Sequence, residues 1–548
     1  MEIIKIEDIS FYYPGEKTAA IWKVSLDIHR GEFVVLCGES GCGKTTLLRM
    51  LKEEIRPEGK LQGNIRYLKN CDKKIGFVMQ CPEEQIVTDK VWHELAFGLE
   101  NMGKPTDVIR RRVAEISGFF GIQSWFYKKT AELSGGQKQL LNLAAVMVME
   151  PEILILDEPT AQLDPIAAAD FIHTLQRLNQ ELGLTILLAE HHMEEAFPAA
   201  DRIWIMEQGS VVYNDSPRNT GAWFRNQKEI HPMLWGMPSA VRIYQGLNVG
   251  GECPVTVKEC RAYLQENYKN EVPMCRTKEH DTSDETALKL EKLWFRYERD
   301  LPDVLEELSL VIKKGEIVSI LGGNGSGKTT LLNVIAGQYR PYAGKIYLFG
   351  KKLSAYRGNS LYRNLLALLP QNPQTLFLRN SVEEDYLEFC RMIGYDRTEA
   401  QQKTEELLWR FELKHLRKRH PYDLSGGEQQ KAALGKLLLS NPKVLLLDEP
   451  TKGIDACAKH HLAELLKELK KQGITILMVT HDIEFAAEVS DRCGMLFQGQ
   501  MISMETPERF FQGNSFYTTA ANRIAGGLYG NVVTCDDVIR VCMENGRK

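Results

Sequence analysis

The stretch GESGCGKTT (Gly38–Thr46) returns later in the chain as GGNGSGKTT (Gly322–Thr330). Four further motifs then recur in the same order: a glutamine at Gln80 and Gln371, LSGGQ at 133–137 and LSGGE at 424–428, LILDEPT at 154–160 and LLLDEPT at 445–451, and a histidine at His191 and His481. The loop lysines, Lys44 and Lys328, lie 284 positions apart in the chain. The two members of each later pair lie 290 or 291 positions apart. Such constant spacing predicts two duplicated domains.

Length and composition indicate a multidomain globular protein. At 548 residues, with 43% hydrophobic and 26% charged residues, the chain exceeds a single hydrophobic core and has ordinary composition. The net charge of −5 gives no sign of the basic face of a nucleic-acid-binding protein, so no nucleic-acid partner is expected. No apolar run approaches the roughly 20 residues that cross a bilayer, and the start MEIIKIED lacks a signal-peptide pattern. We expect a cytosolic protein unless a partner holds it elsewhere.

Apolar strands and helical segments alternate in each copy. Predicted strands precede the glycine-rich loops at 33–36 and 317–321, and predicted helices follow at 45–51 and 329–336. Further apolar strands are expected at 153–156, 185–188, 444–447 and 475–479. Strands that alternate with helices predict an α/β fold with a mainly parallel sheet in each domain.

Four segments are expected along the chain. The predicted boundaries are 1–217 for the first domain, 218–286 for its C-terminal extension and linker, 287–509 for the second domain and 510–548 for a tail. Proline and Gly-Gly interrupt the extension, and the polar run near 278–286 predicts a flexible linker.

The glycine-rich loops predict nucleotide binding. Glycines let backbone N–H groups converge on phosphates, and the following helix directs its positive end at the same anion. Lys44 and Lys328 are expected to contact the β- and γ-phosphates, and Thr45 and Thr329 to bind Mg²⁺. The other loop positions expected at the nucleotide are Gly38, Gly41, Gly43, Thr46, Gly322, Gly325, Gly327 and Thr330.

Paired acids follow the later apolar strands. Asp157 and Asp448 are expected to hold Mg²⁺, directly or through water. Glu158 and Glu449 come next, and strand alternation is expected to point them toward the γ-phosphate as general bases for the attacking water. The motifs therefore predict an enzyme that binds ATP and Mg²⁺.

LSGGQ and LSGGE, together with the other motifs, resemble the ATP-binding cassette (ABC) ATPases, a group of P-loop NTPases. The resemblance implies two tandem cassettes, each with a mainly parallel core sheet, a helical subdomain and a small antiparallel β subdomain. It also implies head-to-tail pairing, in which each ATP lies between one cassette's loop and the other's signature. The implied signature contacts are Ser134, Gly135 and Gly136 in the first cassette and Ser425, Gly426 and Gly427 in the second.

The same resemblance assigns further catalytic and binding residues. Gln80 and Gln371 resemble the glutamine that senses Mg²⁺ and the nucleophilic water, and His191 and His481 resemble the switch histidine. Tyr13 and Tyr297 match the aromatic residue that stacks on adenine, although core packing of an aromatic strand residue is an alternative for both. The first copy reads EHHMEE (190–195) where many cassettes have THD.

A narrower resemblance points to transport. The run VMQCPEEQIVTDKVWHELAFGLENMG (78–103) is similar to the energy-coupling factor (ECF) transporter ATPases, and LWGMPSAVRIYQGL, PVTVKECRAYL and FYTTAANRIAG resemble segments of their fused members. This implies a motor on the cytoplasmic face of the membrane, bound to a transmembrane coupling subunit and through it to a small substrate-capturing subunit. Vitamins or transition-metal ions are the implied cargo. Glu83–Val87 and Gln374–Phe377 are the candidate walls of the grooves for the coupling helices.

Three alternatives from other classes remain at this point. Fused sugar-importer ATPases also have two cassettes, but they commonly lose catalytic residues in the second half, where Lys328 and Glu449 are intact. A tandem-cassette translation factor would act on ribosomes and would be expected to have a long charged helical linker, whereas 218–277 is rich in proline and glycine. A purely structural scaffold is disfavoured by two intact motif sets.

Overall fold

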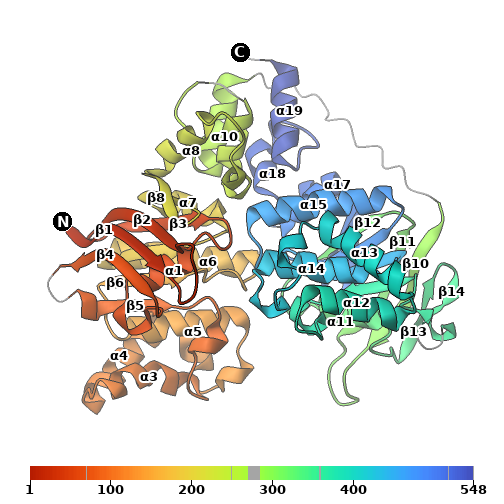
Figure 1. Ribbon diagram of the computed structural model, residues 1–548, viewed down its shortest axis with the longest axis horizontal. Helices are drawn as coiled ribbons and strands as arrows, with labels where there is room; N and C mark the ends of the chain where they lie inside the picture. The colour runs from red at the N-terminus through yellow and green to blue at the C-terminus, as the bar shows by residue number, and fades with distance from the viewer. Residues whose placement is uncertain (69–70, 248–249, 269–283, 357–359, 516, 547–548) are drawn as a thin grey trace. The chain divides into compact units, whose positions relative to one another are not determined.

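The computed structural model describes residues 1–68, 71–247, 250–268, 284–356, 360–515 and 517–546, which form two compact units. The first unit comprises Met1–Cys260 and the second Arg261–Lys548. Both units repeat one order of strands and helices, except for a two-residue strand in the second unit and a four-residue helix in the first (Figure 1). Residues 278–283 of the predicted linker lie outside the described residues, and the predicted domain boundaries stay predictions.

Nine strands lie within the described residues of the first unit. The strands are β1 Glu2–Tyr12, β2 Ile21–His29, β3 Phe33–Gly38, β4 Lys60–Tyr67, β5 Ile75–Val78, β6 Ile153–Asp157, β7 Thr185–Ala189, β8 Arg202–Glu207 and β9 Ser210–Asp215. The helices are α1 Lys44–Met50, α2 Pro82–Gln85, α3 Val91–Asn101, α4 Thr106–Phe119, α5 Gly135–Met147, α6 Pro165–Leu182, α7 Met193–Ala199, α8 Pro217–Arg225 and α9 Ser239–Leu247. Helix α10, Val257–Asn267, follows along the chain.

The core of the first unit is a six-stranded sheet in the order β5-β6-β7-β3-β8-β9. Neighbours from β5 to β8 pair in parallel, and β9 pairs antiparallel with β8. Every residue of β3, β6 and β7 is buried, as expected for parallel strands covered on both faces. A separate antiparallel sheet has the order β2-β1-β4.

The second unit repeats this plan. Its strands are β10 Thr286–Phe295, β11 Leu305–Lys313, β12 Ile317–Leu321, β13 Ala343–Leu348, β14 Lys351–Lys352, β15 Leu366–Leu369, β16 Val444–Asp448, β17 Thr475–Val479, β18 Arg492–Phe497 and β19 Gln500–Glu505. Its helices are α11 Lys328–Ile335, α12 Val382–Ile393, α13 Arg397–Arg410, α14 Gly426–Leu438, α15 Ala456–Lys471, α16 Ile483–Val489, α17 Pro507–Gln512, α18 Ala520–Ala525 and α19 Cys535–Asn545.

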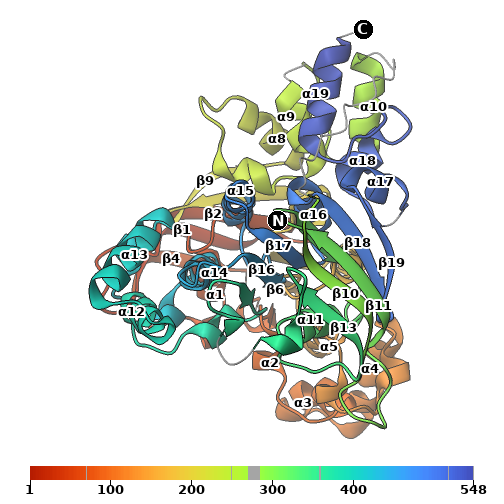
Figure 2. The ribbon, with the colours of Figure 1, turned by 90° about the vertical axis from the view of Figure 1, so that its right-hand side faces the viewer.

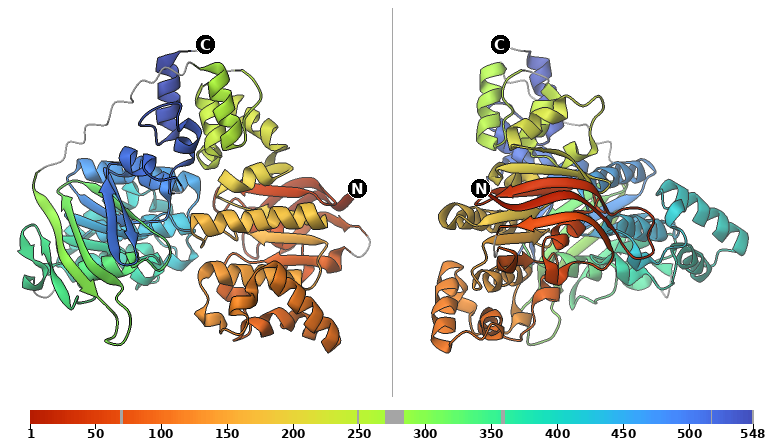
Figure 3. Two further views of the ribbon diagram at one scale, coloured as in Figure 1. Left: turned by 180° about the vertical axis from the view of Figure 1, so that it is seen from behind. Right: turned by 60° about the vertical axis from the view of Figure 1, so that its left-hand side comes forward.

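Each cassette consists of a core sheet, an antiparallel sheet and a group of helices. In the second, the core order is β15-β16-β17-β12-β18-β19 and the antiparallel order is β11-β10-β13-β14. Figure 2 shows β10, β11 and β13 on one side of this unit and α12, α13 and α14 on the other. Figure 3 shows the helices between residues 91 and 147 of the first cassette, in orange, as a separate group beside its core strands. The predicted α/β architecture, with helical and antiparallel subdomains, is confirmed.

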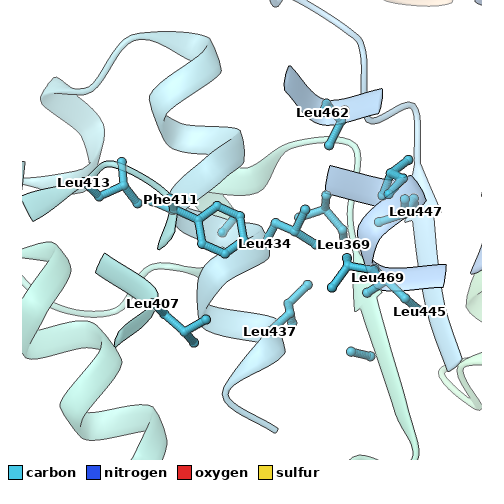
Figure 4. Close-up of a cluster of buried hydrophobic side chains, with 14 of the residues drawn as sticks. Leu369, Leu407, Phe411, Leu413, Leu434, Leu437, Leu445, Leu447, Leu462 and Leu469 are labelled. Carbon is cyan, nitrogen blue, oxygen red and sulfur yellow. The ribbon is translucent and has the colours of Figure 1, made fainter. Parts of the chain in front are cut away.

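Leucine side chains join the helical layer of the second cassette to its core sheet. Leu434 and Leu437 of α14 face strand residues in the same apolar cluster, which also includes α13 residues (Figure 4). The cluster members labelled there are Leu369, Leu407, Phe411, Leu413, Leu434, Leu437, Leu445, Leu447, Leu462 and Leu469. Helix α14, which begins in the LSGGE motif, therefore packs in the same hydrophobic cluster as β16, the strand that ends at Asp448.

Matching contacts anchor the C-terminal segment of each cassette. Glu194 on α7 accepts hydrogen bonds from the backbone N–H and the hydroxyl of Ser239, at the start of α9. Glu484 on α16 accepts one from the backbone N–H of Ala520, at the start of α18. Both acids lie three positions after the predicted switch histidines, so each extension is fastened to the helix that follows its cassette's histidine.

Leu434→Ala is expected to lower the free energy of unfolding of the second cassette by about 2–5 kcal/mol, because it removes a buried side chain and leaves a cavity. Met392→Ala on α12 is the control. Its side chain is exposed, so the change is expected to stay within about 0.5 kcal/mol. Urea unfolding followed by circular dichroism compares the two. Equal losses would contradict the assignment of Leu434 to the core.

Candidate functional site

Four neighbouring strands of the first cassette each end at a predicted site residue. In the sheet order β5-β6-β7-β3, the residues at or just after the strand ends are Gln80, the pair Asp157 and Glu158, His191, and the glycine-rich loop with Lys44. Because carboxyl ends of parallel strands meet at one edge of a sheet, residues far apart in sequence converge there. Strands β15, β16, β17 and β12 bring the matching residues together in the second cassette.

The glycine-rich loops turn sharply into α1 and α11. Gly43 is the N-cap of α1 with φ of 105°, and Gly327 is the N-cap of α11 with φ of 100°. A Cβ at Gly43 would lie 2.6 Å from the carbonyl oxygen of Ala20, so only glycine fits. The remaining predicted residues flank these glycines: Gly38 ends β3, Gly41, Gly322 and Gly325 lie in the loops, and Thr46 and Thr330 lie in the first turns of α1 and α11.

The loop lysines are buried and directed into their own loops. Lys44 Nζ donates to the carbonyl oxygens of Gly38 at 2.9 Å and Glu39 at 3.1 Å. Lys328 Nζ donates to those of Gly322 at 2.8 Å and Gly323 at 3.1 Å. Each ammonium group is therefore fixed at the strand end where an anionic phosphate is predicted to bind.

A hydroxyl and a carboxylate lie together in each site. Thr45 Oγ1 is 3.1 Å from Asp157 Oδ1, and Thr329 Oγ1 is 3.1 Å from Asp448 Oδ1. Burial raises the pKa of Asp157 to about 6, and the neighbouring charge of Glu158 raises it as well. Burial likewise raises the pKa of Asp448 to about 6. Hard oxygen donors in this arrangement fit Mg²⁺.

Glu158 lies among a lysine, a histidine and a glutamine. Its carboxylate is 2.7 Å from His191 Nε2, 3.5 Å from Lys44 Nζ, and accepts a 2.7 Å hydrogen bond from Gln80 Nε2. Although burial alone would raise it, the pKa of Glu158 falls to about 2 because of His191 and Lys44. The acid is thus ionised, as a proton acceptor requires.

Glu449 is ionised for the same reasons but has different contacts. Its carboxylate is 2.7 Å from His481 Nδ1 and 3.8 Å from Lys328 Nζ, and it accepts a 3.1 Å hydrogen bond from the backbone N–H of His481. Burial opposes ionisation, but His481 and Lys328 lower the pKa of Glu449 below its ordinary value. Gln371, the counterpart of Gln80, is exposed.

The orientation of both acids has a different cause from the one expected. Strand alternation was the predicted reason, but Glu158 has φ of 45° and Glu449 has φ of 48°, in the left-handed region. Non-glycine residues in that region are strained and concentrate at functional sites. The backbone turns immediately after β6 and β16, and this turn directs each carboxylate.

The two predicted adenine-stacking tyrosines are partly exposed at the edges of the loops. Tyr13 OH lies 3.0 Å from Thr46 Oγ1, and Tyr297 OH lies 2.8 Å from Thr330 Oγ1. Both follow the end of a strand, since β1 ends at Tyr12 and β10 at Phe295. These positions disfavour the alternative of core packing.

The signature serines begin long helices. Ser134 caps α5 and Ser425 caps α14, each in a capping box with the residue three positions later. Each hydroxyl oxygen accepts a backbone N–H, which leaves its own hydrogen available to an outside acceptor. Gly135 and Gly136 form the first turn of α5, and Gly426 and Gly427 that of α14.

Sequence reasoning missed three buried acids that support these sites. Glu190 precedes His191 and is wholly buried, while Glu94 and Asp385 lie in α3 and α12 beneath the segments that follow Gln80 and Gln371. An acid placed directly after the apolar strand at 185–189 is a signal that could have identified Glu190, because buried acids need hydrogen-bond partners.

Replacing Asp157 and Asp448, the acids predicted to hold Mg²⁺, by asparagine is expected to stabilise the nucleotide-free fold at pH 7.5 by about 1–3 kcal/mol per site. The native-state pKa of each acid, about 6, exceeds its ordinary 3.8, so the charged form destabilises the fold above pH 6. The penalty shrinks as the pH falls toward 4, because the native carboxyl takes up a proton first.

Urea unfolding of wild-type protein and Asp157→Asn/Asp448→Asn, in EDTA between pH 4 and 8, tests this dependence. The stability difference should decrease steadily below pH 6. A variant less stable than wild-type protein at pH 7.5 would contradict the account of these two carboxyls.

Comparisons with known proteins agree with this geometry. The ABC transporter family model matches residues 21–161 and 305–452. An ABC transporter ATP-binding protein of Bacillus cereus (strain ATCC 10987 / NRS 248) is 41% identical over 98% of this chain and 98% of its own length. YkoD of Bacillus subtilis (strain 168), named as an HMP/thiamine import ATP-binding protein, is 30% identical over 92% of this chain and 93% of its own length.

A solved structure shares the tandem fold. The archaeal ribosome recycling factor aABCE1, in complex with the stalk protein aP1, has a TM-score of 0.59 and 21% identity, over 92% of this chain and 91% of that one. Among the helices of the described ranges, none is long and apolar enough to cross a membrane. With both cassettes matched by one family model and a relative aligned over nearly its whole length, this chain belongs to the ABC transporter family and is a two-cassette ATPase.

Proposed function

We propose that this chain is the ATP-hydrolysing motor subunit of a membrane transporter of the energy-coupling factor type, which imports a vitamin or a transition-metal ion. The observation that carries the proposal is a pair of matched apolar side chains beside the two predicted sites. Val87 and Leu378 are each 68% exposed and lie 291 positions apart, the same spacing as the catalytic motifs. Large apolar side chains kept exposed at equivalent places suit a partner surface.

Buried acids hold both apolar residues in place. Glu94 accepts the backbone N–H groups of Val87, at 3.1 Å, and of Thr88, at 2.7 Å. Asp385 accepts the N–H of Leu378 at 2.8 Å and pairs with Lys436 Nζ at 2.6 Å. Because these hydrogen bonds fix the backbone, the apolar side chains of Val87 and Leu378 stay exposed to solvent, as a docking site for a coupling helix requires.

The predicted groove walls need one correction. In the first cassette, Glu83–Val87 includes the exposed Val87 as expected. In the second, Phe377 at the end of the predicted wall is buried in the apolar cluster, and the exposed residue is Leu378. The register of the Leu376–Leu378 segment turns Phe377 inward, so the proposed contact moves one position.

The proposed chemistry follows from charges already described. Glu158 and Glu449 accept a proton from the water that attacks the γ-phosphate, while Lys44 and Lys328 bind the phosphates. His191 and His481 hold the bases in place. Mg²⁺, held by Thr45, Thr329, Asp157 and Asp448 with Gln80 and Gln371, would neutralise phosphate charge. By resemblance to the family, we infer that the signature of each cassette completes the site of the other.

The cargo and the partners belong to this proposal. The 78–103 segment resembles the energy-coupling group, and the name of YkoD assigns that relative to HMP/thiamine import. A transmembrane coupling subunit and a small substrate-capturing subunit would place the chain at the cytoplasmic face of the membrane. The likeness to aABCE1, at 21% identity, shows the fold alone and does not favour action on ribosomes.

Glu158→Gln combined with Glu449→Gln is expected to retain ATP binding and to lower turnover by about 10²-fold or more, because both proton acceptors are lost. Binding is measured with a fluorescent ATP analogue and turnover by phosphate release. Control variants Glu181→Gln and Glu468→Gln replace exposed glutamates of α6 and α15 and should hydrolyse at the wild-type rate. Undiminished turnover in the double variant would refute the proposed bases.

Capture from detergent-solubilised membranes tests the role itself. The tagged Glu158→Gln/Glu449→Gln protein should co-purify with small multi-span membrane proteins, and adding Val87→Glu and Leu378→Glu should abolish their recovery because a charge enters an apolar contact. Val212→Glu, at an exposed position of β9, is the matched control and should leave recovery unchanged. Recovery of ribosomal proteins instead would overturn the transporter role and leave the ATPase standing.

A further inference from the structure

Glu190 joins two segments of the first site. It lies at the end of β7 with no exposed surface. One carboxylate oxygen accepts the backbone N–H of Thr160 at 3.1 Å and its hydroxyl at 2.5 Å. The other accepts the backbone N–H groups of His191 at 2.9 Å and His192 at 3.3 Å. A single carboxylate therefore connects the turn after Glu158 to the segment that contains His191.

The second cassette fixes its histidine in another way. Thr480 occupies the matching position, and its hydroxyl accepts the backbone N–H of Asp482 at 3.0 Å. The backbone N–H of His481 donates to Glu449, which also contacts the ring of the same histidine. Glu449, the proposed base, thus doubles as the acceptor that fixes the histidine segment.

The fold of this segment does not by itself require an acid at position 190. A buried carboxylate is unfavourable unless hydrogen bonds compensate for the lost water. Burial raises the pKa of Glu190, and its hydrogen bonds from Thr160 and His192 oppose the rise. In the second cassette the uncharged Thr480 follows the equivalent strand, β17. The backbone hydrogen bonds at the two strand ends still match, since Glu449 N–H donates to the carbonyl of Val479 and Glu158 N–H donates to that of Ala189.

We propose that Glu190 is a positioning residue for ATP hydrolysis in the first cassette. It holds the backbone of His191 and the turn after Glu158 in one arrangement, so the Glu158 carboxylate contacts the ring of His191 and the amide of Gln80 without holding the backbone itself. The two sites are then not equivalent, because only the second uses its base as a structural acceptor. The inference rests on the proposed roles of Glu158 and His191.

Glu190→Gln tests the proposal in a Glu449→Gln parent, where turnover comes from the first site. Glutamine keeps the shape, but its NH₂ group must face either the N–H of Thr160 or those of His191 and His192. We expect kcat to fall about tenfold with KM for ATP changed less than about twofold, since one bridge is lost and the phosphate contacts remain. Glu190→Thr, which copies Thr480 and suits the strand end, should give the same fall.

Two further measurements separate positioning from general damage. In a His191→Ala background, Glu190→Gln should lower kcat by less than about a further twofold, because coupled residues are not additive. Thr480→Val in a Glu158→Gln parent is the matched control in the second cassette, and its kcat should stay within about twofold of that parent, since Glu449 holds His481 there. Fluorescent ATP binding and circular dichroism verify the fold of every variant.

The outcomes distinguish this inference from the proposed function. Adding Glu158→Gln to the Glu449→Gln parent should abolish turnover, and if turnover persists, the proposed base is wrong. If turnover is abolished while both Glu190 variants keep the parental kcat, only the inference about Glu190 is overturned. A fall confined to KM, full additivity with His191→Ala, or an equal loss for Thr480→Val would also overturn it.

Discussion

Two adjacent carboxylates at the end of one buried strand impose the main constraint on each site. Asp157 and Glu158 cannot both be charged at low cost in so small a volume. Their surroundings separate them, with a pKa of about 6 for Asp157 and about 2 for Glu158. The parallel sheet achieves this because three other strands end near β6 at the same edge. The residues Gln80 after β5, His191 after β7 and Lys44 after β3 all contact Glu158.

The parts of this fold that follow from local rules were predictable from sequence. Apolar runs at 153–156 and 444–447 became buried strands, and Gly43 and Gly327 became left-handed turns into helices. The direction of Glu158 was not predictable in the same way, because strand alternation applies only within the strand. The backbone leaves the strand at that residue, and hydrogen bonds between distant segments fix the turn.

Contacts between residues distant in the sequence also determine features that the resemblance to a known family did not specify. Sequence placed the groove wall at Gln374–Phe377, but whether Phe377 or Leu378 is exposed depends on one peptide N–H that Asp385 binds across seven positions. Glu190 stood out only as a departure from a familiar pattern. Its four donors come from His191 and His192 beside it and from Thr160, 30 positions earlier in the chain, and no local propensity encodes that arrangement.

The duplication explains why such differences between the halves are informative. Both copies have the same strand order in the core sheet and matching backbone hydrogen bonds between strand ends, so one half serves as a reference for the other. Glu94 and Asp385 perform one task with acids of different length, which suggests that the task is needed on both sides. Glu190 and Thr480 differ in charge within the same backbone frame. Since that frame forms without the charge, the buried carboxylate is best explained by what it holds, which is the segment of His191 and the turn after Glu158.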